Sequence, residues 1–307
     1  MRDTSVLIVG GGPVGLSAAV SLGRLGVPCI VVERDPWITS HPKARGVHIR
    51  TMELFRQWGI DGELCRRGLP IGSCRFIYCT SLAGAELGRT TDAGWDGMIS
   101  PTGRLIVSQD VVEEVLIEAA RSYRDVNVVL STELVTLVQT GEGVRATLRH
   151  TDTGEIEEIS ARYTIAADGA SSGVRRSLGV EMDGPGLLGW YASIYYRAGL
   201  ADLVTHRPAA GYVTFEGSVL SVNGTDRWIT VKRLASGTGA RPSLPPPEQS
   251  IAMVRLLIGR PHQPIEILDT MIWGMTATVA RQFHIDRVFL AGDAAHLRPP
   301  TGGFGIW

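Results

Sequence analysis

The chain has 307 residues, 44% of them hydrophobic, which is enough to build one large domain or two interleaved ones. Its formal net charge of −1, without a long block of like charge, argues against nucleic-acid binding. No apolar run is long enough to cross a bilayer, and the first expected strand follows Met1 so closely that no signal peptide fits, so we expect a cytoplasmic protein with no membrane partner.

The first forty residues predict a βαβ unit. Residues 5–9 and 28–32 are short apolar runs, and residues 13–25 between them have apolar side chains at helical spacing. Continuously apolar strands are typical of a parallel sheet that is covered on both faces. The unit therefore favours an α/β fold that begins with a Rossmann-like nucleotide-binding core.

The turn inside this unit carries glycines at the spacing that dinucleotide sites use. Gly10 permits the tight turn, Gly12 lets the backbone approach a pyrophosphate, and Gly15 lets helix and strand pack closely. A carboxylate at Glu33 accepts hydrogen bonds from ribose hydroxyls and repels a 2′-phosphate, which indicates FAD or NAD. The residues of this unit that we expect at the cofactor are Gly10, Gly12, Pro13, Val14, Gly15, Glu33 and Arg34.

The remaining elements fall into two regions of different composition. Helical spacing recurs at residues 51–58 and 111–120, and apolar strands that predict a β-meander lie at 127–130, 134–139, 144–149 and 162–166. From about residue 182 to 275 aromatic and β-branched residues dominate. There we expect a mainly antiparallel sheet with strands at 190–197, 212–215, 219–222 and 228–231, then a helix at 248–258; a final apolar strand follows at 287–291.

Two further glycine motifs complete a recognisable set. Residues 167–175 read ADGASSGVR, and residues 291–296 read AGDAAH before the run PPTGGFG at 299–305. In this order, the motifs resemble the FAD-dependent aromatic hydroxylases, single-component flavoprotein monooxygenases with the para-hydroxybenzoate hydroxylase fold. The resemblance covers nearly all of the chain and decides for FAD over NAD, so that an NAD-dependent dehydrogenase is the poorer alternative.

The resemblance implies roles for residues in the two later motifs. Asp168 and Gly169 would lie behind the pyrophosphate and take part in nicotinamide cofactor use, together with Arg175, and Asp293 would contact the ribityl chain. The alternatives are a β-turn with surface charges for the first motif and a helix N-cap for Asp293.

Other matches to the family lie outside these motifs. The resemblance puts Arg45 near the flavin and its phosphates and Gln109 at the FAD linker; the alternative for Arg45 is a solvated surface charge. It also implies that the glycine-rich run passes beside the isoalloxazine ring, through Pro300, Gly302, Gly303 and Gly305. The family continues into a helix where this chain ends at Trp307, so we expect a fragment, a site completed by another chain, or imperfect flavin binding.

The implied fold is an α/β Rossmann-like FAD-binding domain with a β-meander, interleaved with a mainly antiparallel β-sheet substrate domain. We assign residues 1–72, 101–181 and 276–307 to the first and 73–100 and 182–275 to the second. Aromatic residues of the sheet that either line a substrate pocket or fill the core are Trp190, Tyr191, Tyr195, Tyr196, Tyr212, Phe215 and Trp228.

The implied activity is hydroxylation of a phenolic or polyketide-type aromatic substrate. NADPH or NADH reduces FAD, and O2 then forms the C4a-hydroperoxyflavin that transfers the hydroxyl group. We see no nucleophile–base triad and assign no catalytic residue; His48, His284 and His296 are more often structural. A flavin-binding protein without redox turnover and an inactive fragment stay open, as does self-association into a homo-oligomer.

Cysteine and histidine spacing gives no metal site. The cysteines form no CxxC pair and have no neighbouring histidine at ligand spacing. We expect reduced, mostly buried thiols at Cys29, Cys65, Cys74 and Cys79.

Overall fold

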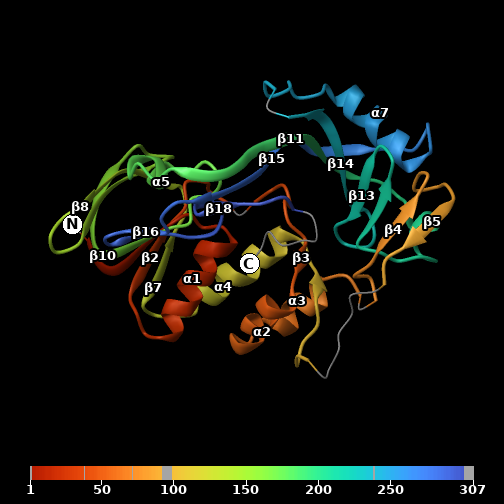
Figure 1. Cartoon of the computed structure of the whole chain (residues 1–307). Helices are drawn as coiled ribbons and strands as arrows, with labels where there is room; N and C mark the ends of the chain where they lie inside the picture. The colour runs from red at the N-terminus through yellow and green to blue at the C-terminus, as the bar shows by residue number, and fades with distance from the viewer. Residues whose placement is uncertain (1, 38, 71, 92–98, 238, 301–307) are drawn as a thin grey trace.

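The computed structural model describes residues 2–37, 39–70, 72–91, 99–237 and 239–300. Figure 1 shows two lobes that are joined by a pair of long neighbouring strands, β11 (Met182–Arg197) and β15 (Glu266–Ala280). One lobe is built on a largely parallel sheet and the other on a largely antiparallel sheet.

The parallel sheet contains the βαβ unit that the sequence predicts. Its parallel strands, in spatial order, are β17 (Val288–Leu290), β10 (Ile156–Ala166), β1 (Arg2–Val9), β2 (Cys29–Val32) and β7 (Val126–Val129). A short strand, β16 (His284–Ile285), pairs antiparallel with β17 at the edge. Because this sheet is covered on both faces, β2 and the second half of β1 are continuously apolar and buried.

Different elements cover the two faces of the parallel sheet. Helices α1 (Pro13–Arg24) and α4 (Gln109–Arg121) share one hydrophobic cluster with β1 and β2. The opposite face packs on the antiparallel strands β8 (Thr132–Gln139) and β9 (Val144–His150), of which β9 pairs with β10. The predicted meander is therefore β8, β9 and β10. The strand expected at 127–130 is present as β7, but its place in the meander was wrong, because it joins the parallel sheet.

Several short elements lie along the chain between the strands of the two sheets. The helix expected at 51–58 is α2 (Ile49–Gln57), which is followed by α3 (Asp61–Arg67). A small ladder pairs β3 (Gly46–Val47) with β6 (Leu105–Ile106). Helix α5 (Gly173–Ser177) follows β10.

The second sheet combines segments that are far apart in the sequence. In spatial order its strands are β18 (His296–Leu297), β15, β11, β14 (Arg227–Ser236), β13 (Gly217–Ser221), β12 (Gly211–Thr214), β4 (Phe76–Cys79) and β5 (Glu86–Arg89). Their pairings are antiparallel except for β12 with β4, which is parallel. The division into two domains stays a prediction, but β15 continues this sheet beyond the proposed limit at residue 275.

One face of the antiparallel sheet forms the core of that lobe. Helix α7 (Pro247–Ile258) lies against it (Figure 1), with the short α6 (Ala201–Val204) nearby. Tyr196, Tyr212 and Trp228 are at most 1% exposed in this core. These aromatic residues therefore stabilise the fold and do not line an accessible surface.

Candidate functional site

The three glycine motifs meet at one edge of the parallel sheet. They follow β1, β10 and β17, which are neighbouring parallel strands, so all three motifs lie at the carboxyl ends of their strands. The amide of Ala167 donates to the carbonyl of Val9 (2.8 Å), and the amide of Ala291 donates to the carbonyl of Ala166 (2.9 Å). Carboxyl ends of parallel strands are where α/β sheets bind their ligands.

Several of these glycines are required by the packing of the protein itself. A Cβ atom on Gly10, which has a φ of +106°, would lie 2.3 Å from the carbonyl oxygen of Ala167. A Cβ on Gly15 would lie 1.9 Å from the carbonyl oxygen of Gly10, and one on Gly292 would lie 2.7 Å from Val14. We call Gly10, Gly12, Gly15 and Gly292 the glycine cradle.

Gly12 differs from the rest of the cradle. It has an ordinary φ of −73°, and none of the described residues lies within 4 Å of the position that a Cβ would take. It is the N-cap of α1, has no side-chain capping bond, and precedes Pro13. Among the residues that the structure describes, no side chain caps the first turn of α1, so its N–H groups are left for an anionic ligand. This geometry fits a dinucleotide pyrophosphate.

Glu33 lies at the end of β2, where the sequence predicts it. One carboxylate oxygen accepts from the amide of Gly11 (2.6 Å) and the other from the amide of Asp35 (3.1 Å). These bonds hold the half-buried carboxylate beside the glycine turn. The neighbouring Arg34 is exposed and lies 3.8 Å from the Asp35 carboxylate.

Asp168 and Arg175 bond to the protein itself. Asp168 accepts from the amide of Val174 (3.1 Å) and from the hydroxyl of Ser172 (2.5 Å), and so fixes the first turn of α5. Arg175 is 8% exposed and donates to the carbonyl of Ala294 (3.0 Å). Arg175 therefore ties the second motif to the third, and the proposed part of Asp168 and Arg175 in cofactor binding stays a prediction.

Asp293 is the central residue of a 3-10 helix, η1 (Gly292–Ala294), whose N-cap is Ala291, so the N-cap alternative for Asp293 was wrong. Burial raises the pKa of the Asp293 carboxyl, against the positive charges of His296 and Lys43. Within the described residues no hydrogen bond reaches this carboxylate. Asp293 is nonetheless solvent-exposed, so its carboxylate is accessible to a hydroxyl-bearing ligand, which would donate to it. Gly169 has a φ of +78°, and none of the described residues lies within 4 Å of its Cβ position.

Gln109 fastens the loop between β2 and β3. Its side-chain oxygen accepts from the amide of Ala44 (3.1 Å), and its side-chain nitrogen donates to Glu113 (2.7 Å). Glu113 is 3% exposed, accepts from the amide of Thr39 (2.8 Å), and has a pKa that burial raises. The sequence analysis missed Glu113, although a charged residue inside the apolar stripe of α4 was a signal for it.

Arg45 is directed at the antiparallel sheet. Its guanidinium donates to the carbonyl oxygens of Ala210 (2.9 Å) and Ser221, and burial lowers its pKa to about 10. The alternative of a solvated surface charge was therefore wrong. Proximity of Arg45 to a flavin stays a prediction.

The structure also shows where several other predicted residues lie. Pro300 is exposed, whereas Gly302, Gly303 and Gly305 lie outside the described residues. His284 packs on Phe289, with ring centroids 5.4 Å apart. Among the cysteines, Cys65 is exposed, contrary to the expectation of mostly buried thiols. In the part of the chain that the structure describes, no cluster of residues has the composition of a metal site.

The face of the antiparallel sheet that α7 leaves free carries a stacked aromatic pair. Tyr191 on β11 and Trp273 on β15 have ring centroids 5.0 Å apart and an interplanar angle of 19°, and both are half-buried. Phe215, by contrast, is 87% exposed in the β12–β13 turn, and Trp190 donates to the carbonyl of Gly239. Trp273 was missed because no strand was assigned to its segment.

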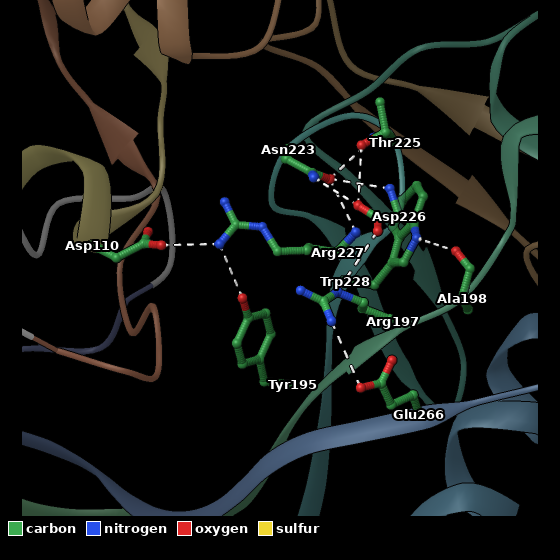
Figure 2. Close-up of polar contacts among 10 residues, drawn as sticks. All are labelled: Asp110, Tyr195, Arg197, Ala198, Asn223, Thr225, Asp226, Arg227, Trp228 and Glu266. Atoms are coloured by element: carbon green, nitrogen blue, oxygen red, sulfur yellow. Dashed lines mark hydrogen bonds and ion pairs between the residues drawn. The ribbon is translucent and has the colours of Figure 1, made fainter.

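A half-buried polar contact joins α4 to this sheet. Arg227 lies between the Asp110 carboxylate (3.0 Å) and the hydroxyl of Tyr195 (3.1 Å), as Figure 2 shows. In the same view, Arg197 pairs with Asp226 at 3.7 Å, at the turn before β14. The predicted pocket residue Tyr195 therefore connects the two lobes.

A second contact of this kind involves His41, which the sequence analysis did not select. His41 Nδ1 lies 2.7 Å from the Asp269 carboxylate on β15, and its Nε2 lies 2.9 Å from the hydroxyl of Ser193 on β11. The imidazole is 4% exposed. The loop that follows Glu33 is thus held to the antiparallel sheet as well as to α4.

The glycine cradle, the acid after β2 and the adjoining antiparallel sheet together define a dinucleotide-binding flavoprotein fold. The chain belongs to the FAD binding domain family, whose model matches residues 3–306. This family assignment confirms FAD as the cofactor and leaves no support for the dehydrogenase alternative.

The similarity to named relatives extends over nearly the whole of this chain. It is 35% identical to a 4-methyl-5-nitrocatechol 5-monooxygenase from Burkholderia sp. (99% of this chain, 58% of the relative). It is 36% identical to a protein from Streptomyces halstedii that is named as a polyketide hydroxylase (98% of this chain, 56% of the relative). A solved ternary complex of aklavinone-11 hydroxylase with FAD and aklavinone superposes with a TM-score of 0.90 at 31% identity (100% and 60%). The chain thus spans a little over half the length of the relatives it matches.

No helix in the described residues is long and apolar enough to span a membrane.

Proposed function

We propose that this chain binds FAD and hydroxylates a phenolic or polyketide-type aromatic substrate, with NADPH or NADH as reductant and O2 as co-substrate. The observation that carries the proposal is the uncapped N-terminus of α1 in the glycine cradle, with open space at Gly12. The names of the relatives, which are nitrocatechol and polyketide hydroxylases, support the choice of substrate class.

Three groups of the protein are suited to hold the cofactor. The first-turn N–H groups of α1 would bind the pyrophosphate, because a helix N-terminus favours negative charge. Glu33 would accept from ribose hydroxyls, and Asp293 would accept from the ribityl chain. FAD, when bound, supplies the redox chemistry and the activation of oxygen.

The remaining work belongs to the chain's own side chains. Tyr191 and Trp273 would stack against a planar ring, since offset aromatic stacking is favourable. Gln109 and Glu113 would hold the cofactor-side loop in place. We further propose a cytoplasmic location; assembly into a homo-oligomer stays a prediction.

The test is a visible absorption spectrum of the purified chain after addition of FAD and desalting, followed by anaerobic NADPH or NADH with and without a panel of phenols. We expect the protein to retain FAD and the flavin to bleach faster when a phenol is present. A chain that retains FAD but is not reduced under any of these conditions would argue for binding without turnover. A chain that retains no FAD would contradict the proposal.

A further inference from the structure

The contact between His41 and the antiparallel sheet has a defined direction. The Asp269 carboxylate accepts from the amide of Thr270 through Oδ1 (2.8 Å) and faces His41 Nδ1 with Oδ2 (2.7 Å). A carboxylate can only accept, so Nδ1 carries the imidazole proton and Nε2 carries a lone pair. The hydroxyl of Ser193 must then donate to Nε2 across 2.9 Å. The free lone pairs of the serine oxygen are left to accept a proton from another hydroxyl group.

The row of hydrogen-bonded side chains Ser193, His41 and Asp269, called the array here, has one end at the aromatic face and the other at solvent. Tyr191 and Ser193 are two residues apart on β11, so their side chains share one face of the sheet, on which Tyr191 stacks with Trp273. Ser193 itself is buried, with 6% exposure. At the other end, the Asp269 side chain is 45% exposed. The array therefore connects the aromatic face with solvent.

We propose that Ser193, His41 and Asp269 form a proton relay that binds a ring hydroxyl of the aromatic substrate and carries its proton to solvent. The inference rests on the proposed function. As the O–H bond of the substrate breaks, its proton passes to the Ser193 oxygen, and the serine proton passes to His41 Nε2. The Nδ1 proton of His41 then passes to the Asp269 carboxylate, which releases it to water. The product is a bound phenolate, whose ring is more electron-rich than that of the phenol.

The surroundings of His41 keep the imidazole ready to accept a proton. Burial lowers its pKa, the Asp269 carboxylate opposes this shift, and the charge of Lys43 adds to the lowering. From β11, the ring of Tyr195 lies against the imidazole at a centroid distance of 5.8 Å. A neutral His41 with an adjacent acceptor is the arrangement that a general base requires.

The same residue types in the same order also occur in serine nucleophile triads, but this site lacks the rest of that machinery. Ser193 lies inside β11, which is hydrogen-bonded on both sides, opposite Val231 of β14 and Met271 of β15. Its neighbouring backbone N–H groups therefore belong to the sheet and do not form an oxyanion site. Proton transfer is the chemistry that remains.

The relay can be tested with 4-nitrophenol, whose ionised form absorbs visible light. The FAD-loaded chain would be saturated with this probe, and the absorbance of the bound probe titrated against pH, separately from turnover. We expect Ser193→Ala and His41→Asn to raise the apparent pKa of the bound probe by about 1 unit, which makes the ionised form about tenfold less favoured. Asp269→Asn should produce a smaller shift in the same direction.

The chain offers a matched control. His150 on β9 also lies between a hydroxyl, Thr132 Oγ1 at 3.0 Å, and a carboxylate, Glu157 at 3.9 Å, but it belongs to the meander. His150→Asn should leave the titration of the probe unchanged. Retention of FAD and a near-ultraviolet circular dichroism spectrum would check the fold of each variant.

The outcomes separate the relay from the proposed function. If the bound probe titrates alike in the wild-type chain, Ser193→Ala and His41→Asn, the relay is wrong and the proposed function stands. If the FAD-loaded wild-type chain binds no probe and no phenol stimulates NADPH or NADH oxidation, the proposed function fails and the relay fails with it. Should His41→Asn not fold, Ser193→Ala and Asp269→Asn decide, because they remove less of the contact.

Discussion

The glycine cradle and the free face of the antiparallel sheet are built in opposite ways. In the cradle, close approaches to Gly10, Gly15 and Gly292 shape the site, and the charged side chains beside it, Asp168 and Arg175, bond to the protein itself. On the sheet, side chains supply the chemistry, through the Tyr191–Trp273 stack and the contacts of His41. The cradle should therefore be sensitive to an added methyl group, and the sheet to the removal of a side chain.

The largest effect is expected behind the sheet, at Trp228. This side chain is fully buried, and its indole N–H donates to the carbonyl of Ala198 (3.1 Å; Figure 2). Trp228→Ala should lower the free energy of unfolding by about 3–5 kcal/mol, because it opens a cavity in the core. Urea denaturation measures the loss, and Phe215→Ala, at an exposed site, is the control. Equal losses in the two variants would contradict this assignment of core and surface.

The cradle makes the opposite prediction, with two glycines as a matched pair. Gly12→Ala should weaken FAD binding about 100-fold, or about 2.7 kcal/mol, because the new methyl group fills the space left for the pyrophosphate. The melting temperature of the FAD-free protein should not change, since no described residue lies within 4 Å of that Cβ. Gly15→Ala should instead cost about 1–3 kcal/mol of stability even without FAD, through its 1.9 Å clash with Gly10.

Fluorescence titration of FAD and thermal melts of the FAD-free variants check this pair. A Gly12→Ala variant that binds FAD as tightly as the wild type would show that the ligand does not approach this glycine.

The cradle was readable from the sequence because its signal is local. A strand, a glycine turn, a helix and Glu33 follow one another within a few tens of residues, and the three motifs were brought together by the order of the parallel strands. Even so, local reading assigned Asp168 and Arg175 by resemblance and could not show that their partners lie within the protein. Asp168 bonds within its own motif, to Ser172 and Val174, whereas Arg175 donates to the carbonyl of Ala294, whose position depends on the whole fold.

The antiparallel sheet was less predictable, because strand register decides on which face of the sheet each side chain lies. Trp228 and Tyr191 look alike in the sequence, but Trp228 lies in the core and Tyr191 on the free face. Within β11 itself, a register change between Trp190 and Tyr191 interrupts the alternation that would show which of its aromatic residues share a face. His41 was invisible for a different reason: its partners are 152 and 228 residues away in the sequence.

The junction between the two regions should respond to charge. Arg227→Met would leave the Asp110 carboxylate, only 18% exposed, without its cation, and should cost about 1–2 kcal/mol, less than a fully buried pair would. Changing Asp110→Asn in the same chain should recover part of the loss, because no unpaired charge remains. Urea melts of the two single variants and the double variant measure the coupling. Strictly additive losses would mean that this ion pair does not hold α4 to the sheet.

The smallest effect, at Asp293, returns to the cradle and to pH. Burial raises the pKa of this carboxyl, so between its ordinary pKa and the raised one the native protein binds more protons than the unfolded chain. Stability of the FAD-free protein should therefore fall as pH rises through that window. Asp293→Asn removes the titrating group, so its melting temperature should depend less on pH in this window.

The same substitution separates stability from binding. An amide accepts hydrogen bonds less strongly than a carboxylate, so Asp293→Asn should weaken FAD binding by about tenfold while sparing the FAD-free fold. Asp152→Asn, at an exposed hairpin turn, is the control for the pH series. If Asp293→Asn leaves both FAD affinity and the pH dependence unchanged, this carboxyl neither has a raised pKa nor binds the cofactor. The side-chain chemistry of the cradle would then rest on Glu33, and binding would depend on backbone geometry even more than the comparison of the two regions implies.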